Sequence, residues 1–294
     1  MNLYKAQKMI KRKVLVTGVT GSQGGSVARS LLRDGHEHSG ITRNIESPKA
    51  LEVKALGLKL HAVDFNDEEA LQEVMKGMDT VFAMTTPFEA GIEGEIRQGI
   101  GLAIAASKAG VGHFVFSSVG DADRNTVIPH FDSKYEVEKY LGGLDIPSSI
   151  VAPSYFMDNL FFPFVLDGLK EGMLKMAMPG NKALQQIAVE DIGKFVSRVI
   201  TERESWFGKR INISGDEITG EKSARILSDV LGKEIRYEGF DPAYLRGQNE
   251  DVALMYEWFN RKGYSARLED MKPYGFLGFE AWARKQDWGA LLES

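Results

Sequence analysis

The chain has 294 residues, with 36 Lys and Arg against 41 Asp and Glu, and its net charge at pH 7 is −5. This balance disfavours a broad nucleic-acid-binding surface, and the absence of cysteine excludes disulfides, thiolate metal sites and a catalytic thiol. No apolar run approaches the roughly 18 residues of a membrane helix and no signal-peptide pattern is found, so we expect a cytoplasmic protein that does not enter a membrane.

Short β-branched runs alternate with longer helical patterns from residue 13 onward, which is typical of βαβ units. We therefore predict an α/β protein in which a Rossmann-type, doubly wound parallel sheet is followed by a smaller α/β C-terminal lobe. The Rossmann domain is expected to span 1–154 and to take in about 186–214, and 155–294 otherwise forms a lobe that meets a substrate or partner. The expected strands are 13–17, 38–42, 59–63, 80–84, 113–117, 148–152 and 210–214. The expected helices are 24–34, 48–56, 68–75, 93–109, 133–144, 190–201 and 220–231.

A glycine-rich turn joins the first expected strand to the first expected helix. Its residues 18–24 read Gly-Val-Thr-Gly-Ser-Gln-Gly. At such a junction the first glycine permits a tight turn, the second lets backbone approach a diphosphate and the third lets the helix pack on the strand, while amide N–H groups at the helix start face the phosphates. A turn without a ligand is the alternative, and the position between strand and helix disfavours it. The expected cofactor contacts in this turn are Gly18, Thr20, Gly21, Ser22, Gln23 and Gly24.

The end of the second expected strand distinguishes NADP from NAD. NAD-binding proteins place Asp or Glu there, whereas residues 42–44 of this chain read Thr-Arg-Asn. A guanidinium binds a 2′-phosphate through two parallel charge-assisted hydrogen bonds. Arg43 therefore predicts NADP(H), with a hydroxyl from Ser22 and a positive charge from Lys49 in support. The alternative is that Arg43 is a solvated surface residue.

The chain resembles the NmrA-like family of atypical short-chain dehydrogenases/reductases over nearly its whole length. The segments that carry the resemblance are 16–24 (VTGVTGSQG), 42–44 (TRN), 130–138 (HFDSKYEVE) and 155–160 (YFMDNL). It implies a Rossmann domain, a smaller C-terminal lobe and NADP(H) between them. Some members of the family regulate partner proteins according to nucleotide redox state, while others reduce quinones or related carbonyl compounds.

Further cofactor contacts are expected at the ends of other strands. Asp64 and Phe65 follow the third strand, where an adenine contact is usual, although Asp64 could equally cap a helix. The resemblance also implies that residues after the fourth, fifth and sixth strands surround the ribose and nicotinamide, while Phe156 could simply belong to the core. These implied contacts are Thr85, Thr86, Pro87, Ser117, Tyr155, Phe156 and Asn159.

Two helical registers compete for the catalytic residues that the wider superfamily places in a Tyr-x-x-x-Lys motif. Tyr135 and Lys139 match the spacing literally. The resemblance instead places the functional lysine at Lys134, a ribose and nicotinamide contact, with His130 in the tyrosine position. At about 100° per residue, Lys134 and His130 lie within about 60° of the apolar Val137, whereas the literal pair lies about 160° away. We therefore expect an exposed tyrosine and an inward Lys134, and His130 is either a proton donor or a structural residue at the helix start.

A complete phosphate turn beside a missing phenolic acid favours an NADP(H)-binding redox sensor or regulator with weak or no turnover. The alternative is an NADPH-dependent oxidoreductase of quinones or small carbonyl compounds, because hydride transfer to a quinone needs less help from a positioned acid. A sugar epimerase or dehydratase is less favoured, since those reactions use the missing tyrosine. The expected partners are the nucleotide and either a protein or a small quinone or carbonyl ligand. His36 and His38 lack a carboxylate triad, so no metal site is predicted.

Overall fold

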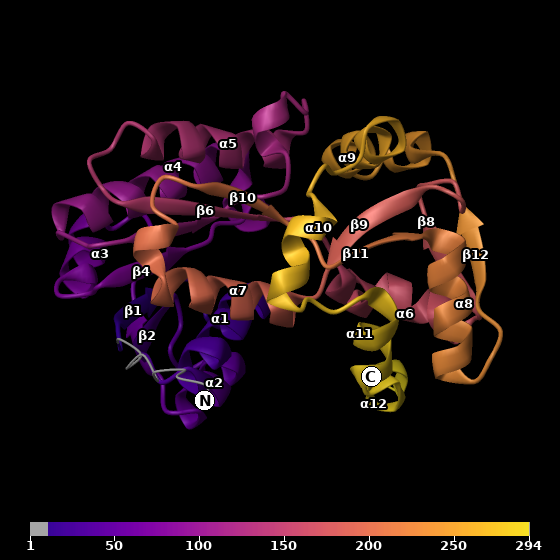
Figure 1. Cartoon of the computed structure of the whole chain (residues 1–294), viewed down its shortest axis with the longest axis horizontal. Coiled ribbons are helices and arrows are strands. Elements are labelled where there is room, and N and C mark those ends of the chain that lie inside the picture. Colours follow the sequence, from indigo (N-terminus) through magenta and orange to yellow (C-terminus); the bar gives the residue numbers. More distant parts are fainter. Residues whose placement is uncertain (1–10, 294) are drawn as a thin grey trace, which may run out of the picture.

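The computed structural model describes residues 11–293, so residues 1–10 and 294 of the predicted domains lie outside the described part. The large sheet has seven strands. Figure 1 shows this sheet and the helices that pack on it at the left, and a smaller group of strands and helices at the right. The predicted α/β class with a Rossmann-type parallel sheet is confirmed. The division into domains at residue 154 remains a prediction.

All strands of the large sheet run parallel. The strand order reverses between β1 and β4, which are neighbours in the sheet, and ligands of such sheets bind beyond the carboxyl ends of the strands at this switch point. The seven expected strands are all present, each within one residue of its predicted bounds. In order across the sheet they are β10 (Arg210–Ile213), β6 (Ser148–Pro153), β5 (Phe114–Ser117), β4 (Thr80–Ala83), β1 (Lys13–Val16), β2 (Glu37–Thr42) and β3 (Lys59–Ala62).

Helices cover both faces of this sheet (Figure 1). One apolar core joins α1 and α7 to one face, and a second joins α3, α4 and α5 to the other. The contact of α1 with α7 is close, because a Cβ atom added at Gly193 would lie 2.4 Å from Ser26 Oγ, and that hydroxyl donates to the carbonyl of Val189 at 2.9 Å. The helices are α1 (Ser22–Arg33), α2 (Pro48–Ala55), α3 (Glu68–Met75), α4 (Pro87–Lys108), α5 (Pro129–Leu141) and α7 (Val189–Thr201).

Two helices begin four or more residues earlier than the sequence patterns predicted. α4 begins at Pro87 instead of residue 93, and α5 begins at Pro129 instead of residue 133. Proline suits the first helical position, because its fixed φ fits the helix and an N–H there would have no helical partner. α4 also contains a break at Gly91, whose φ of 72° and ψ of 176° are not helical. Its first turn is therefore a separate segment.

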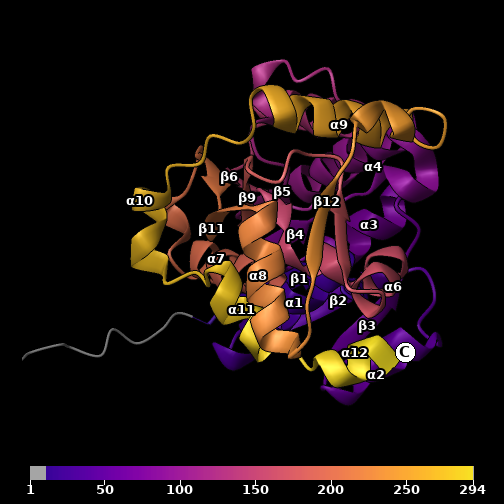
Figure 2. The same cartoon turned by 90° about the vertical axis from the view of Figure 1, so that its right-hand side faces the viewer.

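After β6 the chain builds a smaller group of elements around a third apolar core, seen from its own side in Figure 2. It contains a three-stranded sheet in the order β11-β9-β7 and a two-stranded sheet of β12 and β8. These short strands had no clear sequence signal. The elements are β7 (Tyr155–Phe156), α6 (Pro163–Lys170), β8 (Met173–Met176), β9 (Ala183–Ile187), β11 (Asp216–Thr219), α8 (Gly220–Leu231), β12 (Arg236–Gly239), α9 (Glu250–Arg261), α10 (Leu268–Met271), α11 (Phe279–Lys285) and α12 (Trp288–Glu293).

Helix α9 connects the two groups through aromatic packing. Trp258 and Phe259 of α9 form a fourth core with Phe131 of α5 and with Leu184 of β9. At the other end of α9, Asp251 in its first turn contacts His130 in the first turn of α5. Within residues 11–293, no helix is both long and apolar enough to cross a membrane.

Candidate functional site

The turn between β1 and α1 has a shape that only glycine permits. Gly18 has a φ of +61°, and its carbonyl accepts the N–H of Gly21 at 2.9 Å. A Cβ atom added at Gly24 would lie 2.3 Å from the same carbonyl oxygen. No side chain in the described part of the chain caps α1, so the first N–H groups of the helix are open to an anion. The turn therefore fits a diphosphate.

Side chains tie this turn to the neighbouring strand ends. Gln23 Nε2 donates to Ser117 Oγ at 2.7 Å, which joins the first turn of α1 to the end of β5. Thr17 Oγ1 accepts the N–H of Met84 at 2.8 Å and so joins β1 to the residues after β4. Thr20 is partly exposed and Ser22 is exposed on the rim of the turn. The structure thus brings the predicted residues of β1, β4 and β5 together.

Lys134 lies in the inward register predicted for it. Its ammonium donates to the carbonyl of Thr85 at 2.9 Å and to Glu95 Oε1 at 2.6 Å, and its side chain is 13% exposed. Glu95 of α4 is fully buried and also accepts hydrogen bonds from Thr85 Oγ1 at 3.1 Å and from Ser133. The lysine is therefore held beyond the end of β4 by a buried carboxylate of α4.

Arg43 is exposed at the end of β2, but it is not simply solvated. Its guanidinium lies 2.8 Å from Glu89 Oε1, in the first turn of α4. Lys49 is exposed in the first turn of α2. Thr86 caps α4 by accepting the N–H of Phe88 at 3.4 Å, and Pro87 is the first residue of that helix. Of the three cations predicted to meet the cofactor, Arg43 and Lys134 thus pair with carboxylates of α4.

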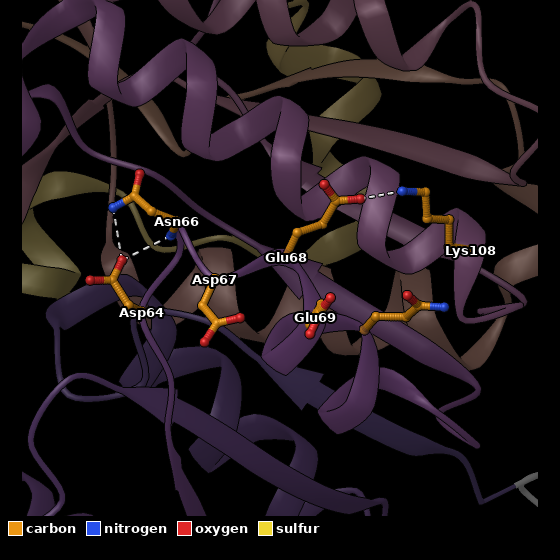
Figure 3. Close-up of a pocket in the computed structure, with 7 residues that line it drawn as sticks. Asp64, Asn66, Asp67, Glu68, Glu69 and Lys108 are labelled. Carbon is orange, nitrogen blue, oxygen red and sulfur yellow. Dashed lines mark hydrogen bonds and ion pairs between the residues drawn. The ribbon is translucent and has the colours of Figure 1, made fainter.

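Asp64 lies beyond the end of β3 at an open depression rimmed by acidic side chains (Figure 3). Its carboxylate accepts both the backbone and side-chain N–H groups of Asn66 at 2.8 Å, and these bonds lower the pKa of Asp64. The helix-cap interpretation of Asp64 is wrong, because Asp67 caps α3 by accepting the N–H of Ala70. Phe65 is partly buried against the second core.

In α5, the inward Lys134 and the exposed Lys139 agree with the predicted helical register, whereas the burial of Tyr135 does not. Lys139 is half exposed and lies 2.6 Å from Glu136. Tyr135 is partly buried, not exposed, because it packs against the aromatic core that α9 places over this part of α5. His130 Nδ1 lies 2.7 Å from Asp251 Oδ2 of α9. His130 is therefore fixed by a carboxylate from the C-terminal part of the chain.

The residues after β6 begin the smaller group of elements. Tyr155 and Phe156 form β7, and Asn159 lies in the following 3₁₀ turn. The Tyr155 hydroxyl lies 3.4 Å from that of Tyr256, and burial raises the pKa of Tyr155. Phe156 packs against the first core while remaining partly exposed.

The histidine pair near β2 has structural partners. His36 Nε2 lies 2.9 Å from Thr201 Oγ1, and its Nδ1 accepts the N–H of Arg12 at 3.2 Å. His38 Nδ1 lies 3.1 Å from the carbonyl of His36. Across residues 11–293, no group of three or more His, Asp or Glu side chains is placed to hold a metal ion.

Three acidic residues of this site were not predicted: Glu89, Glu95 and Asp251. Glu95 had a signal, because it shares the spacing of Gly99 and Leu102 on the buried face of α4, and a carboxylate within an apolar stripe requires a buried partner. Glu89 belongs to the helical turn that was missed before Gly91. Asp251 lies in a region without predicted elements, and nothing in the sequence linked it to His130.

Comparison with known proteins gives consistent matches. The NmrA-like family profile matches residues 10–278. An NmrA-like family domain-containing protein of Dictyostelium discoideum is 32% identical over 270 residues, covering 86% of this chain and 89% of that protein. The negative transcriptional regulator NmrA, in complex with NADP, has a TM-score of 0.79 at 20% identity, covering 95% of this chain and 99% of its own. An NADPH-dependent quinone oxidoreductase of Escherichia coli, complexed with NADPH, has a TM-score of 0.77 at 22% identity, covering 92% and 98%. The solved structures share the fold described above.

Proposed function

Because this chain belongs to the NmrA-like family, we propose that it binds NADP(H) at the carboxyl ends of β1, β2, β4 and β5. The observation that carries the proposal is the glycine turn, where Gly24 has no room for a side chain and no side chain of the described residues caps the start of α1. Arg43 at the end of β2 supplies the cation for a 2′-phosphate. The two structural relatives above were crystallised with NADP and NADPH, which supports the choice of cofactor.

In this proposal, different residues of the chain contact different parts of the cofactor. Ser22 and Lys49 assist Arg43 at the 2′-phosphate, and the turn 18–24 holds the diphosphate. When bound, NADPH supplies a hydride. The remaining contacts are Asp64 and Phe65 at the adenine, and Thr85, Thr86, Pro87, Ser117, Lys134, Tyr155, Phe156 and Asn159 around the ribose and nicotinamide.

The test is a titration of NADPH, NADP⁺ and NADH into the protein while its tryptophan fluorescence is followed. Arg43→Ala removes the proposed phosphate ligand, so the affinity for NADPH and NADP⁺ should fall about 10-fold or more, while that for NADH changes less than about twofold. Arg33→Ala, at the far end of α1 and paired with Asp34, is the matched control. An equal loss for NADH would contradict the role of Arg43.

The first candidate for what the nucleotide does is redox sensing. Its basis is that Arg43 and Lys134 are paired with Glu89 and Glu95, which lie on either side of the break at Gly91. A phosphate that takes Arg43 must displace Glu89 and so acts on the first turn of α4. NADPH and NADP⁺ must differ in their affinity for the two arrangements if this turn is to report redox state.

Hydrogen exchange of residues 86–95 tests the sensor candidate. We expect NADPH to change the protection of this segment relative to the empty protein, and NADP⁺ to change it by a different amount. Identical protection in all three states would overturn the sensor candidate while leaving nucleotide binding intact.

The second candidate is an NADPH-dependent reductase of quinones or small carbonyl compounds. It is favoured by the inward Lys134 of α5, which reaches Thr85 beyond the end of β4, and by the activity for which the Escherichia coli quinone oxidoreductase of the same fold is named. We expect steady NADPH oxidation with a quinone panel. Lys134→Ala should reduce it strongly, and Tyr135→Phe, in the other register, should reduce it little. No turnover across the panel would count against this candidate.

A further inference from the structure

His130 lies one helical turn before Lys134. It is the second residue of α5, and residues four apart share one face of a helix. Lys134 reaches the carbonyl of Thr85 beyond the end of β4. The imidazole therefore lies on the side of α5 that faces the proposed nicotinamide region, at the position where the wider superfamily has its phenolic acid.

Asp251 holds this imidazole in one orientation. Its Oδ2 lies 2.7 Å from His130 Nδ1, and its Oδ1 accepts the backbone N–H of His130 at 3.3 Å. A carboxylate at Nδ1 keeps the proton on that nitrogen and leaves Nε2 for other partners. Nε2 has no hydrogen-bond partner in the described part of the chain, and it is not one of the buried unpaired atoms there. Nε2 is therefore free to meet a bound molecule.

Three charged side chains lie on the helical turns around the imidazole: Asp132, Asp251 and Lys134. Asp132 and Asp251 both act electrostatically on this part of α5, and burial raises the pKa of Asp132. Lys134, one turn further along α5, is itself paired with Glu95 at 2.6 Å. Two carboxylates and one neutralised lysine therefore surround His130.

We propose that the Asp251–His130 pair replaces the missing phenol as the proton donor for reduction of a substrate carbonyl, an inference that rests on the reductase candidate. The substrate carbon accepts a hydride from bound NADPH, which becomes NADP⁺, and the C=O π bond breaks. The substrate oxygen takes the Nε2 proton of a His130 ring that is protonated on both nitrogens, so an aldehyde or ketone becomes an alcohol. Neutral His130 then regains a proton from water. Asp251 is a positioning residue in this scheme.

The pair also indicates a substrate class. Reduction of an aldehyde or ketone develops a basic alkoxide, which a positioned acid stabilises, whereas a quinone yields a less basic oxyanion. A fixed acid at His130 is therefore of most use with aldehydes and ketones.

Kinetics with 4-nitrobenzaldehyde and menadione test the proposal. His130→Gln should lower kcat for the aldehyde about 100-fold, lower that for menadione much less, and leave the NADPH affinity unchanged. The decline of kcat/KM at high pH, caused by loss of the acid's proton, should disappear. Asp251→Asn keeps an acceptor but removes the charge, so kcat should fall about 10-fold with little change in KM. Glu250→Gln, an exposed carboxylate in the same turn of α9, is the matched control and should behave as wild type.

His130→Tyr provides a rescue. A phenol ordinarily keeps its proton to about pH 10, so this variant should recover part of the aldehyde activity and shift the high-pH decline upward. A purely structural role for His130 predicts no such shift.

A spectroscopic measurement on the cofactor-free protein tests the pair without turnover. The chain has five histidines, so the ¹⁵N signals of His130 can be assigned by their loss in His130→Gln. We expect the neutral ring to carry its proton on Nδ1 in the wild type and in Asp251→Asn. In Asp251→Ala, which lacks the acceptor, the proton should no longer be fixed there.

Two results would overturn the pair alone, namely an unchanged proton position in Asp251→Ala, or a wild-type pH profile in an active His130→Gln. Should His130→Gln fail to fold, the ring proton position in Asp251→Ala and the kcat of Asp251→Asn test the pair instead. A wild type that binds NADPH but reduces neither probe would overturn the reductase candidate and, with it, the proton transfer.

Discussion

The glycine turn and the two cations that we propose to meet the cofactor, Arg43 and Lys134, are built differently. The turn is held by backbone contacts among residues 18–24. Arg43 and Lys134 instead depend on carboxylates of α4 that are 46 and 39 residues away in sequence. A phosphate can enter the turn without displacing a side chain there, whereas it must compete with Glu89 for Arg43. In the function proposed above, the turn would therefore provide affinity, and the cations would provide the point at which binding changes the protein.

The largest expected effect is a loss of stability on replacing Glu95, the buried carboxylate that pairs with Lys134. Glu95→Ala leaves the Lys134 ammonium, 13% exposed, without its partner. Removing one member of a buried pair costs about 3 to 5 kcal/mol, so we expect a loss of that size in the free energy of unfolding, measured with urea.

The double variant Glu95→Ala, Lys134→Met separates charge from packing. Because the second change removes the unpaired cation, it should recover part of the lost stability. If the two single losses simply added, the pair would not be the source of the effect.

An intermediate effect is expected in the turn itself. Gly24→Ala places a Cβ atom 2.3 Å from Gly18 O and 2.5 Å from Gly18 C, and backbone cannot yield as a flexible side chain does. We expect a loss of about 1 to 3 kcal/mol in stability and a large loss of NADPH affinity by calorimetry. Gly57→Ala, where φ is +87° and no atom lies within 4 Å of the added Cβ, is the control. It should lower stability by about 1 to 2 kcal/mol but leave NADPH affinity unchanged.

The smallest effect is expected at the exposed ion pair of Arg43 and Glu89. Glu89→Gln frees Arg43, and since such pairs contribute about 1 kcal/mol or less, NADPH affinity should rise up to about fivefold. NADH affinity should stay constant, and the gain should shrink at high salt. Glu46→Gln, which breaks an exposed pair with Lys54, is the matched control. A gain for NADH as well would show that Glu89 does not compete with a 2′-phosphate.

The sequence predicted those parts that local chemistry determines. Alternating apolar runs located all seven strands of the large sheet, and the spacing of Gly18, Gly21 and Gly24 located the turn. The early starts of α4 and α5 were also encoded locally, by Pro87 and Pro129, but the apolar pattern begins later in each helix.

Contacts between distant segments could not be predicted in this way. The partial burial of Tyr135 and the partner of His130 both come from α9, whose packing depends on how the chain returns. The strands β8 (Met-Leu-Lys-Met) and β12 (Arg-Tyr-Glu-Gly) contain no β-branched residue and pair with each other across a long separation in sequence, so the pattern that located the other strands is missing.

The large sheet and its helices cannot be completed early in synthesis, because α7 packs on α1 and β10 pairs with β6. Because Arg210–Ile213 supplies the outer strand next to β6, a ribosome must synthesise the chain through residue 213 before that edge is covered. A fragment ending after β6 would expose an unpaired strand and the apolar side of α1, both of which promote aggregation. The nucleotide-binding half is therefore not a detachable N-terminal module, and a truncated gene product that keeps every predicted phosphate contact in the glycine turn would still lack part of its fold.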